Sequence, residues 1–206
     1  MTLKADEIRE ALAPFGVEVG DHLAGQIREY VRLLLFWNQK INLTAVTEPR
    51  QVLTRHFGES MFGAQLLARP DGKLADVGSG AGFPGLALKL VCPALQVKLI
   101  EPTTKKAVFL SEVMRALELS GVEIVKERIE RLHAVEADIV TARAVGDISS
   151  IAQWAAGVAS IQVLLWLGAE DAAEARRNEG WHWQEPAGLP LSTNRVVLSG
   201  LKAAGS

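Results

Sequence analysis

The chain has 206 residues, 49% of them hydrophobic and 22% charged, which is typical of a soluble globular protein with one domain and a short extension. A formal net charge of −2 excludes a uniformly basic surface, so any contact with nucleic acid must come from a local patch. A single cysteine, Cys92, excludes a disulfide framework, and four scattered histidines show no metal-ligand spacing, so we expect no bound metal.

The first third of the chain is predicted to be helical. Asp21 can cap a helix in which apolar residues recur at spacings of three and four between Leu23 and Leu35. Charged residues begin the chain, and no apolar run approaches the roughly 20 residues that span a membrane. We therefore predict no signal peptide and no membrane contact, and we expect a cytoplasmic protein that is a monomer.

From Lys73 onward, short apolar runs alternate with helical stretches. The expected strands are 74–77, 97–100, 122–125, 137–141 and 161–167, and the expected helices are 84–91, 104–119 and 148–158. Strands separated by helices indicate a parallel sheet that is covered on both faces. Residues 181–184 and 195–198 are strand-like with no helix between them, which predicts a terminal antiparallel hairpin.

A glycine-rich segment from Asp76 to Gly85 joins the first strand to the first helix. Its alternate glycines, including Gly78 and Gly80, allow a sharp turn and the close approach of a ligand. Gly80 to Gly85 also fit the dinucleotide pattern G-x-G-x-x-G, so a nicotinamide cofactor is an alternative. The acid before the first glycine and the terminal hairpin favour an S-adenosylmethionine-dependent methyltransferase instead, with Asp76 near the amino-acid moiety of the cofactor. No Gly-Lys-Ser/Thr follows, which excludes a P-loop.

Two charged residues at strand ends are further candidates for the site. Glu101 ends the second strand, and its carboxylate can accept two hydrogen bonds from ribose hydroxyls. Arg143 lies at the carboxyl end of the fourth strand, where ligands bind in such sheets. Its guanidinium can contact the cofactor, a phosphate or a base edge, and a surface arginine paired with an acid is the alternative.

The choice of methyl-acceptor atom is narrowed by two sequence features that this chain lacks. The segment after the fourth strand reads Thr141-Ala142-Arg143-Ala144, without the Asn/Asp-Pro-Pro-aromatic signature of methylation at an exocyclic amine. Cys92, at a helix end, is better explained as a small core residue than as the nucleophile that methylation of a pyrimidine carbon needs. A ring nitrogen such as guanine N7 needs neither feature and no general base, so Arg143 would serve in positioning.

Several segments match one family in order, from about Asn38 to Val145. They are Asn38-x-x-x-Asn42-Leu43-Thr44-Ala45, Arg55-His56-Phe57, Asp76 to Gly85, Lys105-Lys106 with Phe109-Leu110, and Arg143-Ala144. Together they resemble the bacterial guanine-N7 methyltransferases of small-subunit ribosomal RNA, the glucose-inhibited division protein B family. The resemblance implies methyl transfer from S-adenosylmethionine to N7 of a guanine in the decoding-region (530) loop of 16S rRNA, with the small ribosomal subunit as partner.

The resemblance also implies roles for individual residues. With the loop argument above, the expected cofactor contacts are Asp76, Gly78, Gly80, Phe83, Glu101, Ile129, Glu130 and Arg143. The expected RNA contacts are Asn42, Arg50, Arg55, His56, Lys105 and Lys106. The basic members of this second set would form one patch around the methyl donor. This chain departs from the family in having Glu59-Ser60 where Asp-Ser is common, Pro102 where serine is usual, and Leu167-Gly168 where a lysine and glycine are usual.

We therefore predict an α/β, Rossmann-like class I S-adenosylmethionine-dependent methyltransferase fold. It has a mostly parallel seven-stranded sheet, an antiparallel C-terminal hairpin and an N-terminal helical extension. Residues 1–206 would form a single domain, with the extension at 1–70 and the sheet core at 71–206. Two other functions stay open, namely a methyltransferase of this fold that acts on a small molecule or protein, and a non-catalytic S-adenosylmethionine-binding protein.

Overall fold

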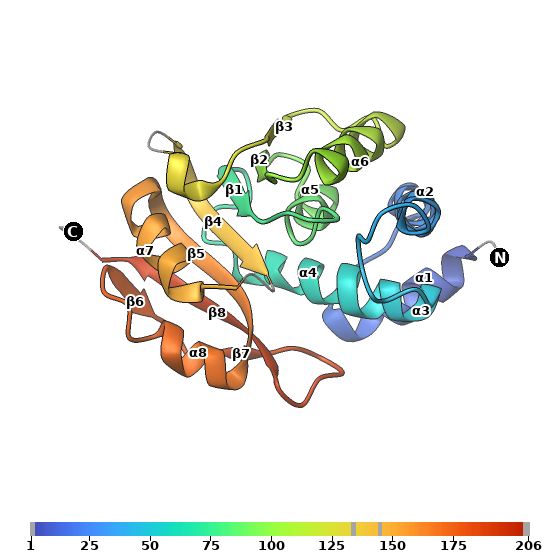
Figure 1. The fold of residues 1–206 in the computed structure, drawn as a ribbon. Helices are drawn as coiled ribbons and strands as arrows, with labels where there is room; N and C mark the ends of the chain where they lie inside the picture. The colour runs from blue at the N-terminus through green and yellow to red at the C-terminus, as the bar shows by residue number, and fades with distance from the viewer. Residues whose placement is uncertain (1–2, 133–134, 144–145, 204–206) are drawn as a thin grey trace.

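A mixed sheet forms the centre of the computed structural model, which describes residues 3–132, 135–143 and 146–203 (Figure 1). Within these residues the sheet has eight strands. They are β1 (Lys73–Val77), β2 (Gln96–Ile100), β3 (Val122–Val125), β4 (Ala137–Arg143), β5 (Ala159–Gly168), β6 (Trp181–Trp183), β7 (Ala187–Gly188) and β8 (Arg195–Lys202). Their order is β3-β2-β1-β4-β5-β8-β6, and the two-residue strand β7 pairs with β8 off this path.

The sheet is mostly parallel, as predicted, but the described residues form eight strands in place of the expected seven, because the two-residue strand β7 pairs with β8 beside the main path. Strands β1 to β5 are parallel, while β8 runs antiparallel to both β5 and β6. The parallel sheet and the antiparallel C-terminal strands that the sequence predicts are therefore confirmed. The order reverses at β1, because β2 lies on one side of it and β4 on the other. In open α/β sheets, ligands bind in the crevice at the carboxyl ends of the strands at such a point.

Helices cover both faces of the sheet (Figure 1). They are α1 (Ala5–Leu12), α2 (Asp21–Asn38), α3 (Pro49–Val52), α4 (Glu59–Phe62), α5 (Gly85–Val91), α6 (Thr104–Ala116), α7 (Ile148–Val158) and α8 (Ala169–Ala175). Three 3₁₀ turns, η1 (Ala13–Phe15), η3 (Gly63–Leu66) and η4 (Ile129–Arg131), and the π-helical turn η2 (Leu53–Gly58) complete the described helical segments. Among the described helices none is long and apolar enough to cross a membrane.

Alternation along the strands builds two separate cores. On β5, Leu164 and Trp166 point to the face covered by the N-terminal helices, α5 and α6. Val163 and Leu165 point to the opposite face, under α7 and α8. Successive side chains of a strand point to opposite faces, so a run that is apolar throughout can fill both cores, as expected of a strand buried on both sides.

The N-terminal helices pack close to the ligand end of the sheet. Ile27, Tyr30 and Leu34 lie on the buried stripe of α2 and are fully shielded from solvent, and a fully buried side chain of this size contributes roughly 1.5–3 kcal/mol. Farther along, α3 runs into α4 through η2, a single π-helical turn. Such turns are often found at functional sites, and this one carries Arg55 and His56.

Candidate functional site

The glycine-rich loop turns sharply at the end of β1. The backbone N–H groups of Gly78 and Ser79 both donate to the carbonyl of Ile100, at 2.9 and 3.2 Å. Gly78, Gly80 and Gly82 have φ values of 66, 56 and 87°, a region that side chains strongly disfavour. A Cβ on Gly80 would meet only the Gly78 carbonyl oxygen, at 3.7 Å. The loop therefore needs its glycines for conformation, and it leaves space beside Gly80.

Asp76 supports this loop from within the protein. Its side chain is fully buried, and its carboxylate accepts hydrogen bonds from the Thr141 hydroxyl at 2.8 Å and the Gly85 N–H at 3.2 Å. Burial raises the pKa of Asp76 to about 6, although the hydrogen bonds from Thr141 and other donors oppose the shift. Asp76 thus links β1, β4 and the start of α5, and its contact with the amino-acid moiety of a cofactor stays a prediction.

Glu101 meets the loop from the end of β2. One of its carboxylate oxygens accepts the Gly80 N–H at 3.0 Å, and the other accepts the Thr103 N–H at 2.8 Å. A carboxylate offers about four acceptor positions, so each oxygen keeps room for a further donor such as a ribose hydroxyl. Two residues that the sequence singled out separately, Gly80 and Glu101, therefore lie in direct contact.

A stack of aromatic rings backs the loop. Phe83 lies between Tyr30 and His56, with ring centroids 5.3 and 5.1 Å apart and interplanar angles of 12 and 24°. The Tyr30 hydroxyl donates to the Ala81 carbonyl at 2.6 Å, which connects α2 to the loop. Tyr30 was not among the predicted site residues, because its place in the apolar stripe of a helix indicates only a core position.

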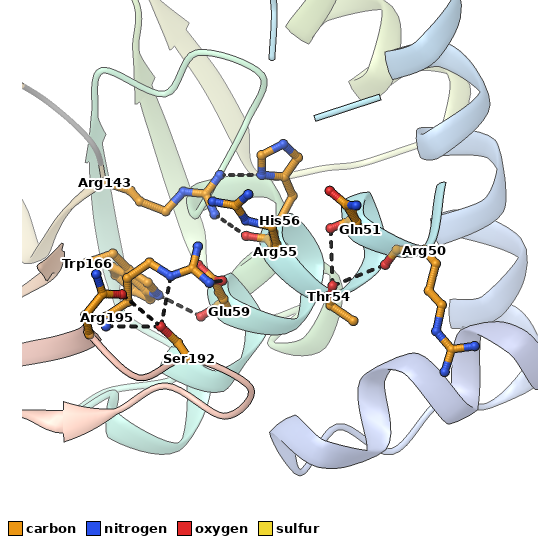
Figure 2. Close-up of polar contacts among 11 residues, drawn as sticks. Arg50, Gln51, Thr54, Arg55, His56, Glu59, Arg143, Trp166, Ser192 and Arg195 are labelled. Atoms are coloured by element: carbon orange, nitrogen blue, oxygen red, sulfur yellow. Dashed lines mark hydrogen bonds and ion pairs between the residues drawn. The ribbon is translucent and has the colours of Figure 1, made fainter. Parts of the chain in front are cut away.

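Arg143 is held by the π-helical turn rather than by an acid. Its Nη1 donates to the Arg55 carbonyl at 2.9 Å, and its Nη2 lies 2.9 Å from His56 Nδ1 (Figure 2). The guanidinium also lies 5.4 Å above the ring of Phe83, a cation–π arrangement. Burial lowers the pKa of Arg143 to about 10, which leaves it positively charged at neutral pH.

His56 is neutral in this arrangement. A guanidinium can only donate, so Nδ1 accepts from Arg143, and Nε2 carries the proton and donates to the Thr44 hydroxyl 2.7 Å away. Burial, followed by the charges of Arg143 and Arg55, lowers the pKa of His56 to about 3. His56 therefore adds no positive charge to the predicted RNA-binding patch, and any contact that it makes with RNA stays a prediction.

The Asn-Leu-Thr segment forms a clamped loop. Asn38 Oδ1 accepts the N–H groups of Leu43 and Thr44, each at 2.9 Å, and Asn38 Nδ2 donates to the Thr44 carbonyl at 2.9 Å. This clamp positions the Thr44 hydroxyl against His56. Asn42 is exposed, so it is accessible to an RNA ligand.

A pocket of about 410 Å³ opens beside Arg143. It is lined by Arg55, His56, Glu59, Arg143 and Arg195, by Asp171, Gly146, Gly168 and Trp166, and by the apolar side chains of Val46, Ile148, Leu167 and Leu189. Arg195 of β8 pairs with Gly168 of β5 in the sheet register, and its Nη2 lies 2.8 Å from Glu59 Oε1 (Figure 2). Burial raises the pKa of Glu59, and the charge of Arg195 is the largest opposing effect.

Sequence reasoning did not predict Arg195 as a site residue, and it named Glu59 only as a departure from the family pattern. The resemblance leads one to expect a lysine where β5 ends, and Leu167-Gly168 stands there instead. The antiparallel strand β8 delivers the guanidinium of Arg195 to the same pocket. The predicted hairpin could have pointed to a cation from β8, but its register could not be read from the sequence.

The remaining predicted residues lie around this centre. Ile129 is half-buried and Glu130 exposed on η4, which follows β3. Lys105 is exposed and Lys106 half-buried in the first turn of α6, and Arg50 is exposed and paired with Glu10 at 3.0 Å. Among the described residues no ion pair or hydrogen bond joins the two lysines to the π-helical turn, so a single RNA patch stays a prediction.

Two absences expected from the sequence concern nucleophiles and metals. Cys92 caps the end of α5 and is partly buried, and burial raises the pKa of its thiol, the opposite of the shift that activates a cysteine. In the part of the chain that the structure describes, no three His, Cys, Asp or Glu side chains gather as metal ligands would.

The fold, with a glycine-rich loop where β1 ends, is the fold of the S-adenosylmethionine-dependent methyltransferases. A methyltransferase of this kind from Aquifex aeolicus superposes with a TM-score of 0.62 at 12% identity, over 76% of this chain and 94% of that one. A ribosomal protein L11 methylase from Lactobacillus delbrueckii gives a TM-score of 0.61 at 13% identity, over 72% and 79% of the two chains. At these identities the likeness concerns the fold alone.

The chain belongs to the rRNA small subunit methyltransferase G family, also called GidB, because the sequence model of that family matches residues 24–185. It is 42% identical over 153 residues to the ribosomal RNA small subunit methyltransferase G of Dehalococcoides mccartyi, over 72% of this chain and 65% of the relative. The protein of that name from Dichelobacter nodosus is 37% identical over 158 residues, covering 76% and 74%. The chain thus spans about two thirds of the length of the relatives that it matches.

Proposed function

We propose that this protein transfers a methyl group from S-adenosylmethionine to N7 of a guanine in the decoding-region loop of 16S rRNA. The observation that carries the proposal is that two sites lie at the same edge of the sheet, where the parallel strands end. The Gly80–Glu101 contact lies at the end of β1 and β2, and the basic pocket around Arg143 lies at the end of β4 and β5. The first fits a nucleoside that carries a methyl group, and the second fits its acceptor.

The loop residues fit the proposed cofactor. Glu101 would accept from the ribose hydroxyls, since each of its oxygens has spare acceptor capacity, and the open side of Gly80 would allow the cofactor to approach the backbone. When bound, S-adenosylmethionine supplies an electrophilic methyl group on a sulfonium. Phe83, 4% exposed and braced by Tyr30, would form the apolar wall that keeps water from the crevice.

The titratable groups of the pocket suit a reaction without a general base. Both ring nitrogens of His56 are engaged, and Glu59 is paired with Arg195. Guanine N7 has an in-plane lone pair and loses no proton when it is methylated, so the protein needs only to align the base and exclude water. Arg143, fixed from two sides, would orient the acceptor or its phosphate.

Three classes of activity can be separated by one assay. The protein is incubated with tritiated S-adenosylmethionine and, in turn, unmodified small subunits, large subunits, and extracts of protein and of metabolites. We expect label in small-subunit RNA alone. Label in protein or in a metabolite would contradict the RNA assignment, and cofactor binding with no label in any fraction would indicate a non-catalytic binding protein.

A further inference from the structure

The carboxylate of Glu59 is an unusual feature of the pocket beside Arg143. Its side chain is 7% exposed, and Oε1 lies 2.8 Å from Arg195 Nη2. Within the described part of the chain, the second oxygen, Oε2, accepts no hydrogen bond. The backbone is fixed as well, because the Glu59 carbonyl accepts the indole N–H of Trp166 at 2.7 Å (Figure 2). The protein thus holds a mostly buried carboxylate in a set position at the wall of a pocket, and one of its oxygens keeps acceptor capacity.

A buried carboxylate is costly unless its oxygens find donors. Arg195 compensates one side of the charge, and because Glu59 lines the pocket, a ligand bound there can offer donors to its carboxylate. Such a site favours a ligand that brings neutral N–H donors and disfavours an anion. Arg143 can still contact a phosphate elsewhere in the ligand, but the negative charge of Glu59 opposes a phosphate at its own oxygens. A base edge that carries donors is the better match.

We propose that Glu59 selects guanine by accepting hydrogen bonds from N1–H and the exocyclic amine of the target base in this pocket. The inference rests on the proposed function. Guanine alone among the four RNA bases presents two adjacent donors on its pairing edge, whereas adenine and cytosine place an acceptor beside their amine, and uracil has one N–H between two carbonyls. N7 lies on a different edge of the purine, so it stays free to react.

The rest of the pocket suits an extruded base. Val46, Ile148, Leu167 and Leu189 supply apolar surface, against which the faces of a base can pack, and its volume of about 410 Å³ falls within the usual range of ligand sites. Enzymes that act on a base in folded nucleic acid take it out of its stack and read its pairing edge in such a pocket. Glu59 would perform that reading here.

Inosine at the methylated position tests the contact, because it keeps N1–H and N7 but lacks the exocyclic amine. Small subunits are reconstituted with 16S rRNA ligated to carry guanosine or inosine there, and kcat/KM is measured for both. For the wild type we expect guanosine to be preferred roughly ten- to hundredfold, the range for a good directional contact to a base. For Glu59→Gln, which replaces one acceptor by a donor, guanosine methylation should fall and the preference should shrink several-fold.

The comparison of ratios removes the intrinsic difference in reactivity between the two bases, because that difference is common to every enzyme form. Glu185→Gln is the matched control, since it breaks the Arg176–Glu185 ion pair (2.9 Å) outside the pocket, and it should keep the wild-type ratio. An undiminished preference in a folded Glu59→Gln protein that binds cofactor normally would overturn the proposal. So would equal rates on both substrates by the wild type, whether or not the variant folds. Absence of methylation by the wild type would instead refute the proposed function.

Discussion

At the scale of single residues, His56 is a neutral side chain that links two others, whereas the sequence placed it among the basic RNA contacts. His56 sits between Arg143 and Thr44, and burial lowers its pKa from 6.5 to about 3. We predict that NMR titration of the His56 ring carbons shows no protonation between pH 8 and pH 5. A midpoint near the unperturbed value of about 6.5 would contradict the described hydrogen bonds.

The sign of the linked stability change follows from the same shift. The pKa of the folded protein lies below that of the unfolded chain, so the unfolded state takes up the proton first as the pH falls. His56 therefore contributes stability that is present above about pH 6.5 and is lost as the pH falls toward 3. The pKa of Asp76 is raised from its ordinary value of 3.8 to about 6, so its contribution to stability has the opposite pH dependence over that range. NMR titration of His56 therefore isolates the effect of His56 better than an unfolding curve does.

Gly82 gives a second prediction at this scale. Its φ is +87°, and a Cβ there would clash with the Tyr30 hydroxyl. Gly82→Ala should destabilise the protein by roughly 2–4 kcal/mol, because it combines backbone strain with a clash in the core. Gly25→Ala is the control, since a Cβ there meets no atom within 4 Å and alanine favours a helix by roughly 0.5–1 kcal/mol. The measurement is the free energy of unfolding of both variants in urea. Equal changes in the two variants would contradict the prediction.

Sequence reasoning singled out residues whose local pattern indicates a role, and their contacts with a cofactor stay predictions. The alternate glycines and the strand-end glutamate can be recognised because conformation and ligand contact restrict those positions directly. Tyr30, Glu59 and Arg195 could not be found in this way. Tyr30 contacts Ala81, 51 residues away in the chain, and Glu59 of α4 contacts Arg195 of β8. No local sequence pattern encodes such long-range contacts.

At the scale of elements, the helix α2 is joined to the glycine-rich loop through one buried hydrogen bond. Tyr30→Phe removes the donor to the Ala81 carbonyl while keeping the stacked ring. We expect a loss of about 1–3 kcal/mol in the free energy of unfolding, the usual result of leaving a buried acceptor unsatisfied, and a weaker affinity for S-adenosylmethionine in calorimetry. Unchanged affinity with reduced stability would show that α2 supports the fold but not the loop.

The elements themselves were predictable where periodicity is strong. The strands at 74–77, 97–100 and 122–125 and the helix at 148–158 match the structure to within a residue. The helix expected to reach Leu119 ends at Ala116, because the chain leaves the helical conformation at Leu117 and Glu118 has a φ of 52°. The short helix α8 escaped prediction, since its buried face consists only of Ala172 and Ala175 and gives no apolar periodicity.

At the scale of the whole molecule, the proposed function requires that a chain of net charge −2 bind RNA through a local surface. Changing Lys105 and Lys106 together to alanine should weaken binding to small subunits and make it less dependent on salt, because fewer counterions are released. Affinity for S-adenosylmethionine should stay the same. The measurement is subunit affinity against ionic strength.

The matched control removes two charges from the other end of the sheet. Lys73 begins β1 and Arg69 lies in the turn before it, away from the carboxyl ends of the strands, and each has an acidic partner. Replacing both by alanine should leave the salt dependence of subunit binding at its wild-type value. If this pair and Lys105-Lys106 behave alike, the binding surface is not centred on the carboxyl ends of the strands.

The central claim concerns the acceptor atom, and the most direct test is to locate the methyl group on RNA that the purified protein has labelled. Small-subunit RNA is methylated with S-adenosylmethionine, treated to cleave the strand at N7-methylguanosine, and read by primer extension. We predict one new cleavage site, in the decoding-region loop of 16S rRNA, that depends on both protein and cofactor. Incorporated label without N7-specific cleavage, or cleavage confined to another region of the RNA, would contradict the account.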